Sequence, residues 1–522
     1  MNGAEVILNI LKKYTDKVFI VSGTDYAAFI EARYRGVGPE FIVIPHEITA
    51  VSAAMGYSLS GKLGVAMVHT VPGTLNSLGI IADAFSSRIP LIVIAGKSPY
   101  TERGSTASRN LRIHWTQDLR DQGGVLRQYV KWDHEIRTVE QIADTIQRGI
   151  QIALSEPPGP VYITVPREIS VADTTLTEKK MDFTEPGVST SKLERAKELL
   201  SNSSAPLIIT WGSGRRRDWF DSVKRFADIH RIPVAGYVGE WLNYPTTGDM
   251  ALDSYNTKDF DVILVFENEV PWIPKYGEPD AKIIRVDVDP LYSQIPYSGF
   301  PCDLCVQSGI SDFLDNLNVK KSWDWGDIFV KQREEKMRKL EKMKDSKRIH
   351  PALLSYELSK IGWTIYNEYP FRGEYAILNR YNQYYADPGF GHLGWALGAG
   401  LGYKISTGEN VIITVGDGSF IEGVPTAFLY TAKRHPVLVV IYDNKSWFAV
   451  EKAVREVFPS TSMDSFPGAD LDIDGLAEVV ESISGEYVYI ESPSEIQDGL
   501  KRGKDAVLAG RTAIIHARTE KV

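Results

Sequence analysis

Short hydrophobic runs that end in glycine, proline or polar residues recur along the first third of the 522-residue chain. They lie at 18–21, 41–44, 65–68, 91–96 and 161–165. Apolar runs of this length, without polar alternation, are typical of strands buried on both faces of a parallel sheet. Helical patterns lie between them, for example at Glu47 to Leu59 and Val139 to Leu154. The pattern therefore predicts alternating strands and helices over residues 1–170.

A second block with the same alternation follows a polar, irregular segment from about Ser170 to Ser191, which we interpret as a linker. Its clearest strands are predicted at 207–210, 262–266 and 282–288. The block ends near Leu317, so we expect a second α/β domain over residues 190–320.

A charged helix predicted over residues 331–348 leads into a third block, which begins near His350. Acidic residues interrupt its basic ones, which favours a solvated connector over a nucleic-acid-binding arm. The predicted strands of the third block contain the runs YAIL, VIITV, PVLVVIY, YVYIE and AIIHA. The expected fold is therefore α/β, with three doubly wound parallel-sheet domains at residues 1–170, 190–320 and 350–522.

Charge and composition narrow the class of protein. Lys plus Arg number 58 against 67 for Asp plus Glu, and this net charge of −9 argues against a nucleic-acid partner. No apolar stretch of 18 residues or more offers a membrane span. The first residues predict an amphipathic helix rather than a signal peptide, so we expect a cytoplasmic protein.

The two cysteines of the chain, Cys302 and Cys305, form a CxxC pair. Such a pair can be a redox or a metal site. A structural zinc site needs two further ligands, and no histidine cluster follows, so we favour two small packing residues.

The third block contains two polar loops directly after predicted strands. VIITV runs into Gly416-Asp417-Gly418-Ser419, and PVLVVIY runs into Asp443-Asn444-Lys445-Ser446. Open parallel sheets bind ligands beyond the carboxyl ends of their strands, so both loops are expected to face one crevice. The carboxylate of Asp417 and the amide oxygen of Asn444 are hard ligands suited to Mg²⁺, and glycine lets backbone N–H groups approach phosphates.

Asn444 follows Gly416 by 28 residues, and this arrangement resembles the motif of thiamin diphosphate-dependent enzymes. Asp443 replaces the first residue of the family's Asn-Asn pair. The resemblance implies that Asp417, Asn444 and the main-chain carbonyl of Ser446 bind the metal. It places Gly416, Gly418 and Ser419 at the cofactor as well. Upstream, residues 391–398 are similar to the family segment in which a large apolar side chain props the cofactor into a bent shape, with Leu393 in that place and Gly391 beside it.

His46-Glu47, between the strand at 41–44 and an Ala- and Gly-rich helix, resembles the segment that carries the family's catalytic glutamate. Thiamin chemistry needs a carboxylate at N1′ of the cofactor's aminopyrimidine ring, and the resemblance assigns that role to Glu47. Read without the resemblance, a glutamate at this position is a favourable partner of the helix dipole.

The loop from Val68 to Asn76 is similar to the active-site loop of benzoylformate decarboxylase, which also carries a histidine. The resemblance makes His69 an acid/base group, a role suited to imidazole near neutral pH. Thr24 takes the place of that enzyme's substrate-binding serine. The enzyme's second active-site histidine has no counterpart, because residues 270–274 contain none.

Other segments are similar to acetohydroxyacid synthase. Residues 98–117 resemble a synthase segment in which Gln117 would be a substrate-side hydrogen-bond donor, with His114 and Trp115 as less favoured candidates. The run that contacts FAD in the synthase is replaced by Phe266 to Glu269, and the synthase tryptophan after the metal asparagine aligns with Ala453. FAD is therefore not an expected cofactor.

The resemblance extends from residue 1 to about residue 520. It implies a thiamin diphosphate- and Mg²⁺-dependent lyase or transferase that acts on 2-oxo acids by decarboxylation, carboligation or both. It also implies a homodimer or homotetramer with active sites between subunits. Two alternatives stay open: a 2-hydroxyacyl-CoA lyase, and a thiamin-binding homologue without catalysis, against which Glu47 argues.

Overall fold

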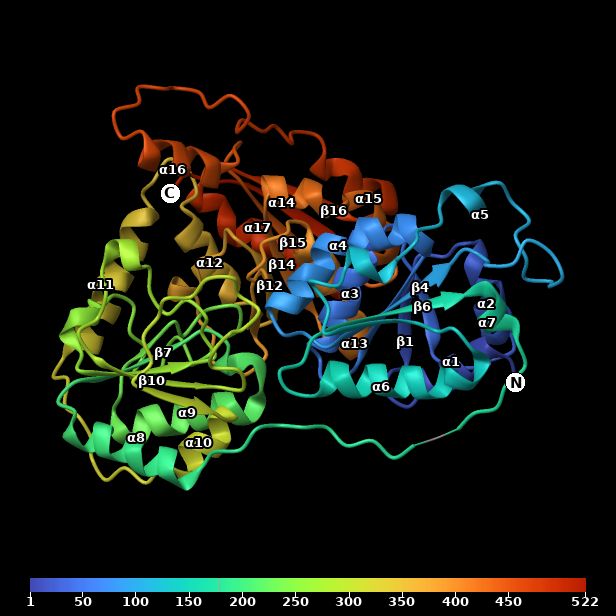
Figure 1. Ribbon diagram of the computed structural model, residues 1–522. Helices are drawn as coiled ribbons and strands as arrows, with labels where there is room; N and C mark the ends of the chain where they lie inside the picture. The colour runs from blue at the N-terminus through green and yellow to red at the C-terminus, as the bar shows by residue number, and fades with distance from the viewer. Residues whose placement is uncertain (178) are drawn as a thin grey trace.

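The computed structural model describes residues 1–177 and 179–522, and its described strands form three separate sheets in which all pairs are parallel. Figure 1 shows the first sheet on the right, the second on the lower left and the third behind and above them. The expected α/β class with three parallel sheets is confirmed.

The first sheet has the strand order β2-β1-β3-β4-β6-β5. Its strands are β1 (Lys17–Ile20), β2 (Glu40–Val43), β3 (Gly64–Val68), β4 (Leu91–Lys97), β5 (Trp132–Glu135) and β6 (Pro160–Pro166). The helices of this part are α1 (Gly3–Leu11), α2 (Ala27–Tyr34), α3 (Glu47–Ser58), α4 (Thr70–Ser86), α5 (Ile113–Thr116), α6 (Ile142–Leu154) and α7 (Arg167–Val171). Helices α1, α2 and α6 share one hydrophobic core with the sheet, and α3 and α4 share another.

The second sheet has the order β11-β10-β9-β7-β8. Its strands are β7 (Pro206–Thr210), β8 (Val234–Ala235), β9 (Val262–Phe266), β10 (Lys282–Asp287) and β11 (Leu304–Gln307). The helices here are α8 (Thr190–Asn202), α9 (Arg217–His230), α10 (Ile310–Asn316) and the connector α11 (Ile328–Met343). A separate hydrophobic core fills this part, as expected for an independent α/β layer structure.

The third sheet has the order β13-β12-β14-β15-β17-β16. Its strands are β12 (Thr364–Glu368), β13 (Tyr384–Tyr385), β14 (Val411–Gly416), β15 (Leu438–Asp443), β16 (Glu486–Ile490) and β17 (Ala513–Arg518). The helices are α12 (Pro351–Ser359), α13 (Trp395–Thr407), α14 (Asp417–Glu422), α15 (Pro425–Ala432), α16 (Phe448–Val457) and α17 (Ile496–Leu508). Each of the first and third sheets places its second strand on one side of its first and its third strand on the other. Ligands bind at the carboxyl edge of such a switch point.

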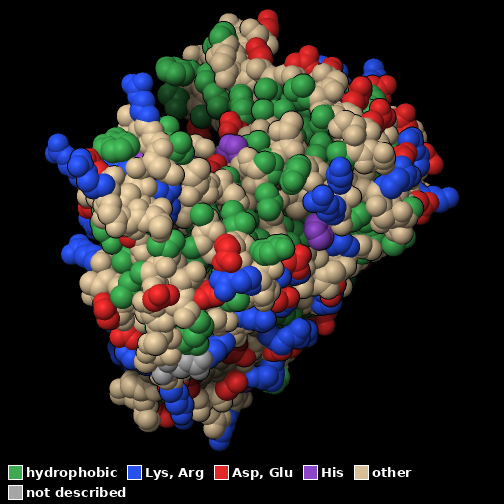
Figure 2. Space-filling model, turned by 90° about the vertical axis from the view of Figure 1, so that its right-hand side faces the viewer, with side chains coloured by type: hydrophobic (Ala, Val, Ile, Leu, Met, Phe, Trp, Pro, Cys, Tyr) green, Lys and Arg blue, Asp and Glu red, His purple; other side chains and the backbone are tan. Residues whose placement is uncertain are grey.

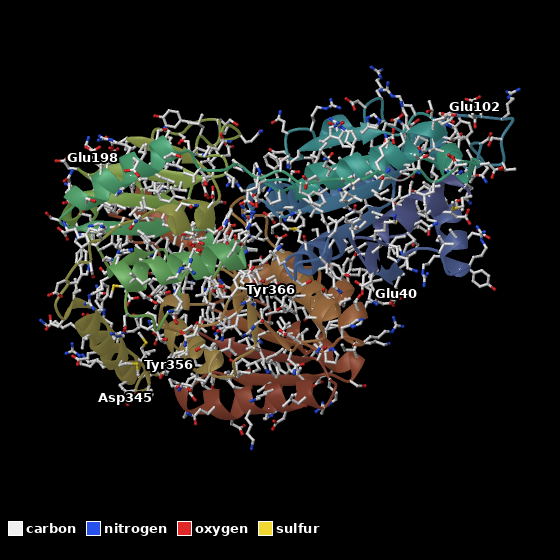
Figure 3. All side chains as sticks on the ribbon, turned by 90° about the horizontal axis from the view of Figure 1, so that it is seen from below. Glu40, Glu102, Glu198, Asp345, Tyr356 and Tyr366 are labelled. Carbon is white, nitrogen blue, oxygen red and sulfur yellow. A yellow bond between two sulfur atoms is a disulfide. The ribbon has the colours of Figure 1, made fainter. Side chains whose placement is uncertain are left out.

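Helices α3 and α13 join the first and third parts at very close range. A Cβ atom added at Gly56 would lie 1.8 Å from the carbonyl oxygen of Ala399, and one at Gly402 would lie 1.8 Å from that of Ala53. Only glycine fits at this crossing. In Figure 3 Tyr366 of β12 lies inside this junction, whereas Glu40, Glu102 and Glu198 lie at the periphery. Its ring contacts Tyr385, Trp395 and Tyr403.

Buried ion pairs tie the second sheet to the first part. Arg88, just after α4, lies 2.9 Å from Glu267 and 2.7 Å from Asp287, at the carboxyl ends of β9 and β10. Arg215 pairs with Glu156 at 2.9 Å and with Glu267 at 3.2 Å. The run at Phe266 to Glu269, where the synthase has its FAD-contacting residues, is thus engaged in contacts between domains.

The strand predicted at YAIL is wrong. Tyr375 ends a short 3-10 helix at 373–375, and residues 376–378 belong to no strand. The first strand of the third sheet is β12, whose sequence TIYNE was not predicted. Asn367 and Glu368 made it look like a surface segment, yet both are buried with hydrogen-bond partners. Burial of a polar group is compatible with a strand when its hydrogen bonds are made within the protein.

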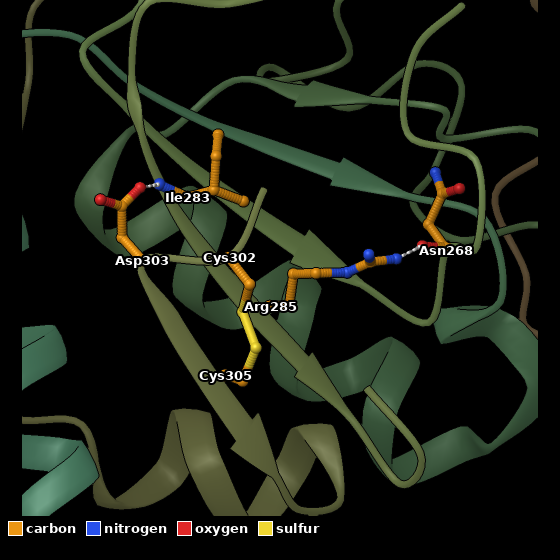
Figure 4. The surroundings of a disulfide bond; sticks show 6 residues. All are labelled: Asn268, Ile283, Arg285, Cys302, Asp303 and Cys305. Atoms are coloured by element: carbon orange, nitrogen blue, oxygen red, sulfur yellow. Dashed lines mark hydrogen bonds between the residues drawn. A yellow bond between two sulfur atoms is a disulfide. The ribbon is translucent and has the colours of Figure 1, made fainter. Parts of the chain in front are cut away.

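The interpretation of the two cysteines as small packing residues also needs correction. Figure 4 shows Cys302 and Cys305 joined by a disulfide beside β10, where Ile283 donates its N–H to Asp303 and Arg285 bonds the carbonyl of Asn268. In residues 1–177 and 179–522, no helix combines the length and the apolar character that crossing a membrane requires.

Candidate active site

A pocket of about 450 Å³ opens at the carboxyl edge of the third sheet. Its lining contains every residue that the sequence predicted to hold a cofactor: Gly391, Leu393, Gly416, Asp417, Gly418, Ser419, Asn444 and Ser446. These residues come from three separate stretches of the chain. The stretches follow β13, β14 and β15, and they come together because these strands run parallel in one sheet, so the loops after them leave it at one edge.

The two polar loops of the motif are in direct contact. Asp417 Oδ2 accepts a hydrogen bond of 3.2 Å from the N–H of Ser446, and Asp417 Oδ1 accepts one of 2.9 Å from Gly418. The amide oxygen of Asn444 is buried and has no partner within the described residues. The carbonyl of Ser446 accepts one hydrogen bond, from Phe448, and keeps a second lone pair.

This set of oxygen atoms fits a Mg²⁺ ion. Magnesium in proteins is held by one or two carboxylates or carbonyl oxygens together with substrate phosphates. An unsatisfied buried amide oxygen is costly, and a metal ligand role would remove that cost. Burial, and then the neighbouring Asp443 carboxylate, raise the pKa of Asp417 to about 7.

Asp443, the departure from the family motif, is fully buried at the end of β15. Its carboxylate accepts hydrogen bonds from His516 at 2.8 Å, from Arg518 at 2.5 Å and from the N–H of Lys445 at 2.8 Å. Burial acts to raise the pKa of Asp443, but these three partners prevail and lower it. The loop that carries Asn444 is therefore anchored to β17 by a charged group.

Leu393 is half-buried at the edge of the pocket, just before α13. Glu368, at the end of β12, accepts hydrogen bonds from the N–H groups of Gly394 at 2.7 Å and Ala396 at 2.8 Å. Burial raises the pKa of Glu368 to about 7. This carboxyl group fixes the segment that presents Leu393, a role the sequence did not indicate.

A second group of polar side chains lies at the carboxyl edge of the first sheet. Glu47 is the first residue of α3 and is 7 % exposed, and its Oε2 accepts a hydrogen bond of 3.1 Å from Asn76. A Cβ atom at Gly73 would lie 3.1 Å from Glu47 Oε1, so the absence of a side chain at Gly73 leaves this oxygen accessible.

His69 directly precedes α4, and its Nδ1 lies 2.6 Å from Asp25 Oδ1. The hydrogen bond with Asp25 raises the pKa of His69 against the opposing effect of burial, and Gln117 and Glu47 contribute in the same direction. Thr24 lies beside this pair, with His114 Nε2 3.5 Å from its hydroxyl. The structure thus brings Thr24, Glu47, His69 and Gln117 to one edge of the sheet.

Strained backbone angles occur next to His69 and next to Asn444. Thr70, next to His69, has φ of +37°, and Lys445, next to Asn444, has φ of +58°. Residues other than glycine rarely adopt these angles, least of all a β-branched residue such as Thr70. Strain of this kind clusters at functional sites, where the surrounding structure holds it in place.

The second group of polar side chains stands apart from the described lining of the pocket around Asp417. Among the described residues that line the pocket around Asp417, neither Glu47 nor His69 is present. The sequence analysis did not predict three residues that contact the site residues: Asn76, Asp25 and Glu368. Asp25 stands next to the predicted Thr24, so its position could have suggested it. For Asn76 and Glu368 only the folded contacts reveal a partner.

Comparison with known families agrees with this geometry. Residues 1–125 match the thiamine pyrophosphate enzyme N-terminal TPP binding domain, and residues 372–517 match the C-terminal TPP binding domain of the same enzymes. The chain belongs to the thiamin diphosphate-dependent enzyme family that includes acetolactate synthase and benzoylformate decarboxylase, and it is an enzyme of this type.

Individual relatives span nearly the whole chain. It is 24 % identical to a probable acetolactate synthase large subunit of Methanocaldococcus jannaschii, over 99 % of this chain and 91 % of that protein. It is 22 % identical to the acetolactate synthase isozyme 2 large subunit of Escherichia coli, over 85 % of this chain and 83 % of the relative. A thiamine diphosphate-dependent 4-hydroxybenzoylformate decarboxylase of Rhodococcus jostii has the same fold, with a TM-score of 0.80 and 20 % identity over 100 % of this chain and 99 % of that one.

Proposed function

We propose that this protein uses thiamin diphosphate and Mg²⁺ to act on a 2-oxo acid, by decarboxylation, carboligation or both. The observation that carries the proposal is the buried oxygen of Asn444, which has no hydrogen-bond partner among the described residues and lines the same pocket of about 450 Å³ as Asp417. The names of the relatives support the substrate class. We assign residues 1–170 to the pyrimidine side of the cofactor, 190–320 to a central domain and 350–522 to the diphosphate and the metal.

The pocket residues that the sequence predicted have separate tasks in this proposal. Asp417, Asn444 and the Ser446 carbonyl hold the metal, and the backbone around Gly416, Gly418 and Ser419 binds the diphosphate. Leu393 and Gly391 set the shape of the pocket beside the cofactor. When bound, thiamin diphosphate supplies the electron sink that lets CO₂ leave a 2-oxo acid.

On the opposite side, Glu47 presents its free oxygen to the pyrimidine ring and holds or accepts a proton there. His69 gives a proton to, or takes one from, the substrate oxygen through its Nε2 atom. Thr24 and Gln117 bind the substrate by hydrogen bonds. The side-chain nitrogen of Gln117 is buried and has no partner among the described residues, which supports a donor role.

The complete site requires two chains in this proposal, with Glu47 of one chain facing Asp417 of another. The separation of the two groups within one chain supports this arrangement. Exposed apolar side chains near both groups support it as well: Leu75 on α4 is 52 % exposed and Tyr369, after β12, is 54 % exposed. Figure 2 shows hydrophobic side chains gathered over the upper part of one face. A twofold pair of chains would cover such surfaces.

The test is an incubation of the purified protein with thiamin diphosphate, Mg²⁺ and a panel of aliphatic and aromatic 2-oxo acids. CO₂, aldehyde and acetolactate are measured in parallel. Aldehyde with CO₂ indicates a decarboxylase, and acetolactate indicates a synthase. The proposal is wrong if the protein binds the cofactor and releases no CO₂ from any of these acids.

A further inference from the structure

Two consecutive residues after β1 point to two different imidazole rings. Thr24 and Asp25 begin the short 3-10 helix η1 (Thr24–Tyr26). Asp25 is buried and contacts His69, whereas Thr24 is exposed and contacts His114 of α5. The site thus has a second histidine, supplied by the loop after β4 rather than by the central domain.

The contact between Asp25 and His69 is built into the surrounding backbone. A Cβ atom at Gly96 would lie 1.6 Å from Asp25 Oδ2, and one at Gly23 would lie 1.9 Å from His69 Nδ1. Neither position tolerates a side chain while the pair is present. The side chain of Asp25 is 3 % exposed and that of His69 is 21 % exposed. Because Asp25 takes the Nδ1 side of the ring, Nε2 is the nitrogen that remains for a substrate.

His114 differs from His69 in its hydrogen bonds and in the direction of its pKa shift. Its Nδ1 accepts a hydrogen bond of 3.2 Å from the N–H of Asn110, so this nitrogen carries no hydrogen and Nε2 carries it instead. Burial, then Arg167 and Arg109, lower the pKa of His114. A neutral ring with hydrogen on Nε2 donates to the Thr24 hydroxyl, which leaves the Thr24 hydrogen free to point away from His114.

We propose that Asp25 positions His69 as the proton-transferring imidazole, and that His114 orients the Thr24 hydroxyl as a hydrogen-bond donor to the substrate. This inference rests on the proposed function. When a nucleophile adds to the carbonyl carbon of the 2-oxo acid, the electron pair of the C=O bond moves to the oxygen. The protonated His69 gives the hydrogen on Nε2 to this oxygen and becomes neutral. The Nδ1–H group of His69 stays hydrogen-bonded to Asp25 throughout. His69 then recovers a proton on Nε2 from solvent. His114 and Thr24 exchange no proton. The pKa of His69 is raised and that of His114 is lowered. Opposite shifts of this kind are typical of sites in which one group transfers a proton and the other does not.

The variant Asp25→Asn tests the first half, because it keeps the volume and removes the charge. His69 is observed by NMR in protein without cofactor or substrate, and its signal is assigned by comparison with His69→Gln. We expect the titration midpoint of His69 to fall by about one pH unit. We also expect kcat to fall by ~10²-fold and the alkaline limb of its pH profile to move to lower pH. An unchanged midpoint would mean that Asp25 only fills space.

The variant His114→Leu tests the second half, with His114→Gln as the conservative variant that retains a donor. We expect His114→Leu and Thr24→Val each to raise KM for the 2-oxo acid by about tenfold, the effect of losing one neutral hydrogen bond. The double variant should lose no more than either single one, since both remove the same contact. His114→Gln should recover most of the loss. Additive losses, or a shifted pH limb in His114→Leu, would contradict the assignment of His114.

His435→Gln serves as the remote control, because His435 is half-buried before β15 and far along the chain from both rings. It should change neither the His69 midpoint nor KM. The NMR result and the proposed function can fail separately. If Asp25→Asn lowers the His69 midpoint and no 2-oxo acid reacts, the pairing of Asp25 with His69 stands and the proposed reaction does not.

Discussion

Asn76 Nδ2 donates a hydrogen bond of 3.1 Å to Glu47 Oε2, and this contact holds one oxygen of the carboxylate while the other faces Gly73. Glu47 is the first residue of α3, and Asn76 lies in the second turn of the next helix, α4. The buried Glu47 carboxylate is therefore aimed in one direction. It is the group we expect to contact the pyrimidine ring of the cofactor.

Glu47→Gln should separate cofactor binding from cofactor activation. Glutamine retains the volume and the oxygen that bonds Asn76 but has no negative charge. We expect the affinity for thiamin diphosphate to change little and hydrogen exchange at C2 of the bound cofactor to slow by several orders of magnitude. Exchange is measured by quenched-flow NMR. An exchange rate equal to that of the parent protein would rule out the role of Glu47.

His69→Ala should affect proton transfer to the substrate rather than activation of the cofactor. We expect C2 exchange to stay near the parental rate and turnover of the 2-oxo acid to fall by ~10²-fold or more, the usual contribution of a positioned acid/base group. Because the pKa of His69 is raised, the protonated form persists to higher pH, and activity that needs it is lost as pH rises through that pKa. Equal turnover of variant and parent from pH 5 to 8 would make this histidine structural.

Asp417→Ala and Asn444→Ala should each weaken binding of Mg²⁺ and thiamin diphosphate. Loss of a direct ligand is expected to lower the affinity by more than ~100-fold, since even residues behind the ligands contribute 10–100-fold. Isothermal titration calorimetry with Mg²⁺ present measures this. Ser446→Ala is the matched control, because it keeps the main-chain carbonyl. If Asp417→Ala binds the cofactor like the parent, the metal assignment is wrong.

Mixing two inactive variants should restore activity if the site lies between chains. In a mixed dimer of Glu47→Gln and Asp417→Ala, one site carries both changes and the other carries neither. Random reassociation would recover about a quarter of the parental activity. Dissociated and reassociated samples of each variant alone are the controls. A mixture that stays inactive, although mass spectrometry detects mixed dimers, would place the whole site in one chain.

Asp83→Asn should make stability less sensitive to pH. Burial raises the pKa of Asp83 to about 9, while its Oδ1 accepts a hydrogen bond of 3.1 Å from the N–H of His392. The folded state therefore keeps a proton that the unfolded state releases above pH ~4, so stability falls as pH rises from ~4 to about 9.

Asparagine keeps the acceptor oxygen and has no proton to lose. The Tm of Asp83→Asn should exceed the parental Tm by a margin that grows over this pH range to a few °C or more, as ~2–4 °C accompany each kcal/mol in a domain of ordinary size. Differential scanning calorimetry at several pH values measures it. Asp144→Asn, at an exposed position, is the control. A margin that is constant with pH would show that Asp83 ionises freely in the folded protein.

Much of the fold could be predicted from the sequence because hydrophobic runs determine strands locally. Runs such as VAMV and LIVIAG have no polar residue to place on a surface, so they specify buried parallel strands. The segment TIYNE does contain polar residues, and only the contacts of Asn367 and Glu368 made its burial possible. The edge strand β5 was missed for a related reason, since its sequence WDHE is largely polar, and β13 was missed because it is only two residues long.

The candidate site likewise combines features that the sequence predicts with features that only the folded structure decides. The sequence by itself determined that Asp417 and Asn444 follow buried strands, and it predicted that they share the crevice in which the structure finds both residues. It also determined the candidates Glu47 and His69 through their resemblance to known enzymes. The partners of those groups are decided by tertiary structure. Asn76 meets Glu47, Asp25 meets His69 and His114 meets Thr24 across 29, 44 and 90 residues of chain. Hydrogen bonds over such separations depend on how strands order in a sheet, which no local pattern encodes.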